Sequence, residues 1–115
     1  MNSLDKHTET ITILNFNKEV ESKYYTDYFT QNEIIKYAKK RKKGSLAARF
    51  LIKKLIRNHF NQQVEYTDIE LLNDDIGKPT LCILGKSDFE VKHIHFSLSH
   101  SQDEVAVIVI FENGL

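Results

Sequence analysis

The sequence has few of the residues that build disulfides, metal clusters and membrane spans. Its 115 residues include one cysteine, one proline and no tryptophan. A single thiol cannot form an internal disulfide or a cysteine metal cluster, so both are excluded. No apolar run reaches the roughly 18 residues of a transmembrane helix, and no signal-peptide pattern opens the sequence. These absences predict a cytoplasmic protein.

Acidic residues are missing from one long segment. Residues 34–64 hold ten of the sixteen Lys and Arg and none of the sixteen Asp and Glu, although the formal net charge of the chain is zero. The rest of the chain is correspondingly acidic. Such a charge distribution creates a local field that can attract an anionic ligand or an acidic partner.

The centre of the basic segment, residues 45–60, has the periodicity of an amphipathic helix of about four turns. Its expected inner face is Ala48, Leu51, Ile52, Leu55, Ile56 and His59. Arg49, Lys53 and Arg57 recur every four residues on another face, and no acid lies among them to neutralise them. This face is either a solvated helix surface or a site for phosphate groups or a carrier protein.

The remaining chain predicts an α+β fold, with a mostly antiparallel sheet packed on the long helix. Predicted strands cover residues 8–16, 66–72, 80–84, 93–99 and 104–111, the last as a central strand. Residues 18–29 are expected to form a short helix or turn that presents aromatic side chains to the core, and residues 85–92 a loop or short helix. We expect one domain over residues 1–115, with residues 1–7 frayed.

Local signals set the ends of several elements. Thr30 and Glu33 have the spacing of a capping box, so a helix is expected to follow. Residues 39–43 are too charged to pack, and Gly44 is expected to let the chain turn into the long helix. Residues 73–79 (NDDIGKP) have the chemistry of a tight turn between two strands.

Three stretches occur in the order and near the spacing of one known family. They are RKKGSLAARFLIKK at residues 41–54, DIELLNDDIGKPTL at 68–81 and IHFSLSHSQDEVAVIVI at 94–110. Together they resemble the holo-acyl-carrier-protein synthase family, the small 4′-phosphopantetheinyl transferases. The TQNE segment at residues 30–33 also has a counterpart there, so the resemblance covers most of the chain from residue 30 to residue 112.

The resemblance implies a function. Members transfer phosphopantetheine from coenzyme A to a serine of an acidic acyl carrier protein, as in fatty acid or polyketide biosynthesis. They have the phosphopantetheinyl transferase fold, with one lobe or two pseudo-twofold lobes, often as a homotrimer with coenzyme A between protomers. Their reaction uses Mg²⁺ on the pyrophosphate, cations for the leaving phosphate and a base for the serine.

Several site residues are implied by position in the motifs. Arg49, Lys53, Lys78 and His100 match basic residues of the family, and Lys40, Arg41 and Lys42 lie where the family places cations near the coenzyme A 3′-phosphate and adenine. The implied coenzyme A site is therefore Lys40, Arg41, Lys42, Arg49, Lys53, Lys78 and His100. The implied catalytic residues are Lys53, Lys54 and His100.

The metal ligands of the family do not match. Lys54 lies where the family has a helix glutamate, and the first-strand aspartate falls on Asn15 in the best register. Mg²⁺ takes oxygen ligands, usually including carboxylates, and an ammonium would repel it. We therefore expect no Mg²⁺ at the usual position. Lys54 either supplies the missing positive charge at the pyrophosphate or pairs with a nearby carboxylate and leaves the site inactive.

Three functions remain open. The first is a transferase with an altered metal requirement. The second is a catalytically silent relative that binds coenzyme A, a carrier protein or a related transferase as a partner subunit. The third, a nucleic-acid-binding module, is disfavoured because no aromatic stacking motif accompanies residues 39–43. Neither a membrane nor a nucleic acid is an expected partner.

Overall fold

The structure is a computed structural model that describes residues 3–39 and 43–113. The strands are β1 (Ser3–Thr12), β2 (Ile69–Asn73), β3 (Pro79–Ile83), β4 (Ile94–His100) and β5 (Glu104–Asn113). The helices are α1 (Ile13–Glu19), α2 (Tyr25–Tyr28), α3 (Gln31–Tyr37), α4 (Lys43–His59) and α5 (Asp88–Val91). Two 3-10 turns, η1 (Ser22–Tyr24) and η3 (Tyr66–Asp68), precede α2 and β2. None of the described helices is long and apolar enough to cross a membrane.

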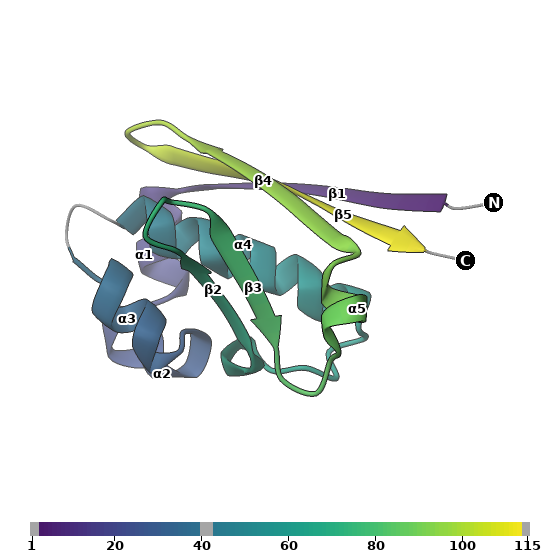
Figure 1. Cartoon of the computed structure of the whole chain (residues 1–115). Coiled ribbons are helices and arrows are strands. Elements are labelled where there is room, and N and C mark those ends of the chain that lie inside the picture. The colour runs from purple at the N-terminus through teal and green to yellow at the C-terminus, as the bar shows by residue number, and fades with distance from the viewer. Residues whose placement is uncertain (1–2, 40–42, 114–115) are drawn as a thin grey trace.

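Two antiparallel sheets flank the long helix α4 (Figure 1). The larger sheet has the order β1–β5–β4, and the smaller is the hairpin of β2 and β3. Strand β5 is central, as its apolar sequence predicts, and pairs with β1 and β4 along most of its length. The α+β class and the packing of an antiparallel sheet on one long helix are thereby confirmed.

The long helix is more deeply buried than its sequence predicts. Every residue from 46 to 53 is buried, including Arg49 and Lys53. A helix that is covered on most sides belongs inside a fold, whereas an amphipathic pattern predicts one solvated face. The larger sheet covers one side of α4, and the segment that contains α1, α2 and α3 covers another. Over these turns, therefore, no basic stripe faces solvent.

The start of α4 also differs from the prediction. The helix begins at Lys43, so Gly44 lies in its first turn and does not form a hinge before it. Positive φ angles occur at Gly77 and Gly85, where the chain turns, and not at Gly44. A Cβ atom at position 44 would lie 3.8 Å from Val105 and 3.9 Å from the His100 ring. Gly44 thus lies close to β4 and β5.

The N-terminal strand is placed differently from the prediction. Residues 3–7, expected to be frayed, form the first half of β1 and pair with residues 109–113 of β5. The strand ends at Thr12, and residues 13–16, expected to continue it, form the first turn of α1. The side chain of Thr12 accepts a hydrogen bond from the backbone N–H of Asn15 at 3.0 Å. This N-cap ends the strand and begins the helix.

Several local predictions are confirmed. Thr30 and Glu33 form the reciprocal capping box that begins α3. Residues 74–78 form the turn between β2 and β3, in which Asp74 accepts from the backbone N–H of Lys78 at 2.8 Å.

The strand predicted for residues 66–72 begins later than expected. Its first three residues form η3, and β2 begins only at Ile69.

Candidate functional site

A cavity of about 400 Å³ lies where α4, the β2–β3 hairpin and β4 meet. Every residue of the described chain that lines it belongs to one of the three sequence motifs. The lining residues are Ser45, Arg49, Leu71, Asn73, Gly77, Pro79, Phe96, Ser97, Leu98 and His100. The fold thus brings three segments far apart in the sequence to one hollow.

Arg49 forms part of the wall of this cavity and is firmly held. Its Nε donates to the backbone oxygen of Leu71 at 2.6 Å, and Nη1 donates to that of Ser45 at 3.1 Å. Its guanidinium lies 3.6 Å from the centre of the Tyr37 ring. Burial lowers the pKa of Arg49, and Tyr37 and Glu33 partly offset this effect. Arginine nevertheless keeps its charge in proteins, so this wall presents a fixed cation.

His100 and Lys78 are the more exposed basic residues of the region. His100 ends β4 and lines the cavity. Lys78 is exposed and lies between two lining residues, Gly77 and Pro79, in the turn that forms the rim. Arg49 and His100 therefore line one cavity, and Lys78 belongs to the turn beside it. The predicted residues Lys40, Arg41 and Lys42 lie outside the described part of the chain.

Lys53 points into the protein interior and does not line this cavity. Its side chain is fully buried, and Nζ donates to Glu33 Oε1 at 2.5 Å and to the backbone oxygens of Tyr28 and Tyr66 at 2.9 and 3.1 Å. Burial lowers the pKa of Lys53, whereas Glu33 acts against this shift. An ammonium has three N–H donors, and all three have partners. The predicted contact of Lys53 with phosphate, and its predicted catalytic role, do not fit this placement.

Lys54 lines a second cavity, of about 420 Å³, between α4 and the edge strand β1. Its Nζ lies 3.1 Å from Oε1 of Glu9. The hydrogen bond to Glu9 raises the pKa of Lys54, so the residue is an ammonium at neutral pH. Asn15 lines the same cavity, but it belongs to α1 and not to the strand. The strand residue opposite Lys54 is Glu9, six positions earlier than the predicted register.

The residues of this second cavity do not fit Mg²⁺. Of the carboxylates that line it, those of Glu9, Glu19 and Glu104, the first is already paired with an ammonium, and no group of three His, Cys, Asp or Glu within the described residues could hold a metal ion. An ammonium and a divalent cation 4 Å apart repel by about 8 kcal/mol at an effective dielectric constant near 20, before screening by water. No step of the proposed reaction is therefore assigned to a metal ion at this position.

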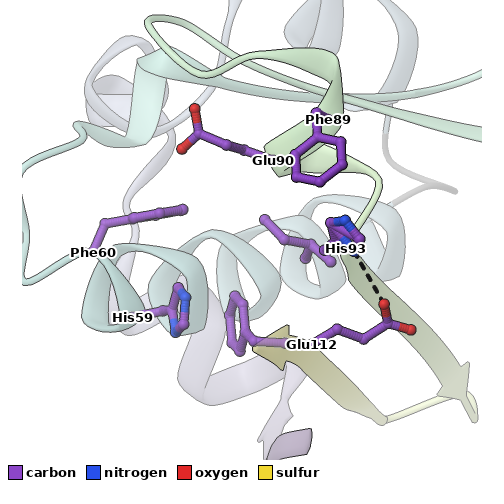
Figure 2. Close-up of a pocket in the computed structure, with 8 residues that line it drawn as sticks. His59, Phe60, Phe89, Glu90, His93 and Glu112 are labelled. Atoms are coloured by element: carbon purple, nitrogen blue, oxygen red, sulfur yellow. Dashed lines mark hydrogen bonds and ion pairs between the residues drawn. The ribbon is translucent and has the colours of Figure 1, made fainter. Parts of the chain in front are cut away.

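A third cavity, of about 200 Å³, lies at the end of α4 beside α5 (Figure 2). It is lined by His59, Phe60, Phe89, Glu90, His93, Ile94, Phe111 and Glu112. Glu112 contacts two imidazoles, His93 Nδ1 at 3.1 Å and His95 Nε2 at 2.9 Å. His93 Nε2 is buried and has no hydrogen-bond partner among the described residues. Among the residues that the structure describes, no predicted site residue lines this cavity.

We expect His59, in this third cavity, to make stability depend on pH. Its ring stacks on Phe111 with the ring centres 3.8 Å apart, and burial lowers its pKa, with a smaller opposing effect from Asp5 and a further lowering by His7. The unfolded chain therefore binds the proton more readily, and the stabilisation present above pH ~6.5 is lost as pH falls. Urea unfolding from pH 7.5 to 5 should show a steeper fall for the natural chain than for His59→Gln. Equal slopes would contradict this assignment.

Two residues of the described sites, Glu9 and Glu33, were missed as site residues. Glu9 and Ile11 are two positions apart in β1 and so share its inward face. A carboxylate at such a core-facing position is a signal that could have identified Glu9. Glu33 was predicted as a capping residue only. The capping box gives a partner to one carboxylate oxygen. In the structure both oxygens also accept hydrogen bonds from residues outside α3, Oε1 from Lys53 and Oε2 from the backbone N–H of Leu71.

Comparisons with known proteins agree with the motif resemblance. A family model described as "4'-phosphopantetheinyl transferase, N-terminal" matches residues 26–111. A holo-[acyl-carrier-protein] synthase of Clostridium tetani is 32% identical over 116 residues, covering 90% of this chain and 91% of its own. One from Vibrio campbellii is 32% identical over 94 residues, covering 73% and 75%. A Bacillus anthracis holo-(acyl-carrier-protein) synthase crystallised in complex with CoA (3',5'-ADP) is 25% identical, covers 95% of this chain and 96% of its own, and has a TM-score of 0.73.

Proposed function

Because the chain belongs to the 4′-phosphopantetheinyl transferase family, we propose that it transfers phosphopantetheine from coenzyme A to a serine of an acyl carrier protein. The observation that carries this proposal is the cavity whose lining comes entirely from the three family-like motifs. The Bacillus anthracis relative, whose fold covers nearly the whole chain, supports coenzyme A as the substrate.

The charges around this cavity suit an anionic ligand. Arg49 supplies a cation that three contacts hold in place, and Lys78 extends from the rim on an exposed turn. A fixed guanidinium recognises phosphate without reorganisation, while a lysine on a turn adds a mobile charge. We assign both to the phosphates of coenzyme A. The same role for Lys40, Arg41 and Lys42 stays a prediction from the motif.

We assign His100 to the chemical step. The serine oxygen of the carrier protein attacks the phosphorus that bears pantetheine, a P–O bond to serine forms, and the P–O bond to the adenosine 3′,5′-bisphosphate leaving group breaks. The serine hydroxyl loses its proton in this step, and an imidazole in the cavity can accept it. Lys53 takes no part, because its three donors are occupied in the interior.

The outer face of the larger sheet supports self-association. Ala106, Ile108 and Ile110 of β5 alternate with core residues, and Thr8 and Ser97 lie on either side of Ile108. Ile108 is 37% exposed, and no element of the described chain covers this face (Figure 1). We propose that copies of the chain associate through it, as a homotrimer or with a related transferase.

An acidic carrier protein would meet the basic residues at the rim of the cavity. We place this encounter, and the protein, in the cytoplasm.

Mass spectrometry tests the proposed transfer. The full chain is incubated with an apo acyl carrier protein and coenzyme A, and the carrier should gain the mass of phosphopantetheine. His100→Ala should reduce the rate by about 10²–10⁴-fold, the usual contribution of a general base. A carrier with its serine replaced by alanine is the control.

Calorimetry with coenzyme A, done beside the mass measurement, distinguishes a transferase from a catalytically silent relative. Coenzyme A that binds in calorimetry without any mass gain would identify a silent, partner-like relative. The Glu9–Lys54 ion pair favours that second candidate, because Lys54 lies where the family has a helix glutamate and its ammonium is already paired with a carboxylate. Neither transfer nor binding would contradict both.

A further inference from the structure

The cleft beside β1 contains a cation of its own. Lys54 of α4 and Glu9 of β1 face each other with 3.1 Å between Nζ and Oε1, and each side chain is about one third exposed, 39% and 34%. Glu9 is the only hydrogen-bond partner of Lys54 Nζ among the described residues. The ammonium therefore has donors left that can be directed into the cavity of about 420 Å³.

The other charges of the cleft are all negative. Glu19 and Glu104 line the same cavity as Glu9, and Lys54 is the only Lys or Arg of residues 3–39 and 43–113 that does so. Without Lys54, the charged residues that the structure places in this lining would all be carboxylates, and such a negative hollow attracts cations. With Lys54, the carboxylate closest to the helix is neutralised and the central position is positively charged.

We propose that Lys54 is the resident cation of this cleft and makes coenzyme A binding independent of Mg²⁺. The part that concerns coenzyme A rests on the proposed function. The part that concerns metal binding in the cleft does not. Lys54 neutralises Glu9 and excludes a divalent cation from this cleft, while the phosphates of coenzyme A are assigned to the separate cavity that Arg49 lines. Because Lys54 acts in place of a metal, changing this one residue should alter the metal affinity of the protein.

Manganese binding tests the cleft without coenzyme A. Electron paramagnetic resonance and calorimetry of the full chain with MnCl₂ should show no saturable site in the natural protein. Lys54→Glu, and to a smaller extent Lys54→Gln, should bind Mn²⁺ more tightly by about tenfold or more, since even indirect partners change metal affinity by roughly 10–100-fold. Lys23→Glu makes the same charge change at a lysine that is 67% exposed and lines none of the three cavities, and it should behave as the natural chain.

Two results would contradict the role proposed for Lys54. A saturable Mn²⁺ site in the natural protein that is lost in Glu9→Gln would overturn the proposal. So would folded Lys54→Glu and Lys54→Gln proteins that bind Mn²⁺ no better than Lys23→Glu. Circular dichroism establishes which variants are folded.

Coenzyme A calorimetry on the natural chain needs no variant. Binding should be the same in EDTA and in MgCl₂, and an affinity about tenfold or more higher with Mg²⁺, equal to about 1.4 kcal/mol, would overturn the inference. If coenzyme A binds in neither buffer, the proposed function fails while the manganese result still decides the role of Lys54.

Discussion

Replacing Glu33 by alanine is expected to lower the free energy of unfolding by about 3–5 kcal/mol, the usual cost of leaving one partner of a buried ion pair alone. Glu33 and Lys53 are both fully buried, and their side chains meet at 2.5 Å. Without the carboxylate, Lys53 keeps only two backbone oxygens. The N–H group of Leu71, which donates to Glu33 Oε2 at 2.8 Å, would also lose its acceptor.

Urea denaturation of the variant and two companions would measure this effect. Glu21→Ala removes an exposed glutamate whose lysine partner is 3.5 Å away, and it should change the free energy of unfolding by no more than about 0.5 kcal/mol. The double variant Glu33→Gln/Lys53→Met removes both charges and should be more stable than Glu33→Ala. A loss below about 1 kcal/mol for Glu33→Ala would show that the pair is not buried as described.

The second large effect is expected at Phe16, whose replacement by alanine should cost about 3–5 kcal/mol. Phe16 is fully buried in α1 and contacts the rings of Tyr25, Phe29 and Phe50. Leu14, two positions earlier, is 65% exposed. Leu14→Ala should therefore change stability by no more than about 0.5 kcal/mol.

This pair of variants also distinguishes helix from strand. In a strand, residues 14 and 16 would point to the same face, and both substitutions would have similar effects. In a helix they are about 200° apart, so one side chain is buried and the other is exposed. Chemical denaturation of the two variants would give the answer, and equal losses would restore the strand predicted for residues 13–16.

The sequence was sufficient for the class of fold because hydrophobic period and turn chemistry are local. The long helix, the central strand β5, the capping box before α3 and the β2–β3 turn all follow from residues a few positions apart. The end of β1 was missed for a local reason as well. The β-branched Ile13 extends the strand-like run by one residue past Thr12, and the hydrogen bond from Asn15 to the Thr12 side chain outweighs its strand preference.

The candidate site was less predictable because it depends on partners distant in the sequence. Periodicity places Lys53 on a polar face, whereas its burial is made tolerable by partners distant in the sequence, chief among them the carboxylate of Glu33, twenty residues earlier. Likewise, the motif identified Lys54 as unusual, but its partner Glu9 lies 45 residues away, and the predicted register pointed to Asn15 instead. Arg49 and His100, which come from two of the three motifs, were predicted together and line one cavity.

The three hydrogen bonds of Lys53 have a consequence for how the protein assembles. They join α4 to Tyr28, 25 residues earlier, and to Tyr66, 13 residues later, besides Glu33. If only one of these flanking segments docked, the ammonium would lose part of its hydration before all its donors had partners, so a half-assembled state is disfavoured. We therefore expect the two segments to close around α4 cooperatively, as in the two-state unfolding usual for single domains of this size.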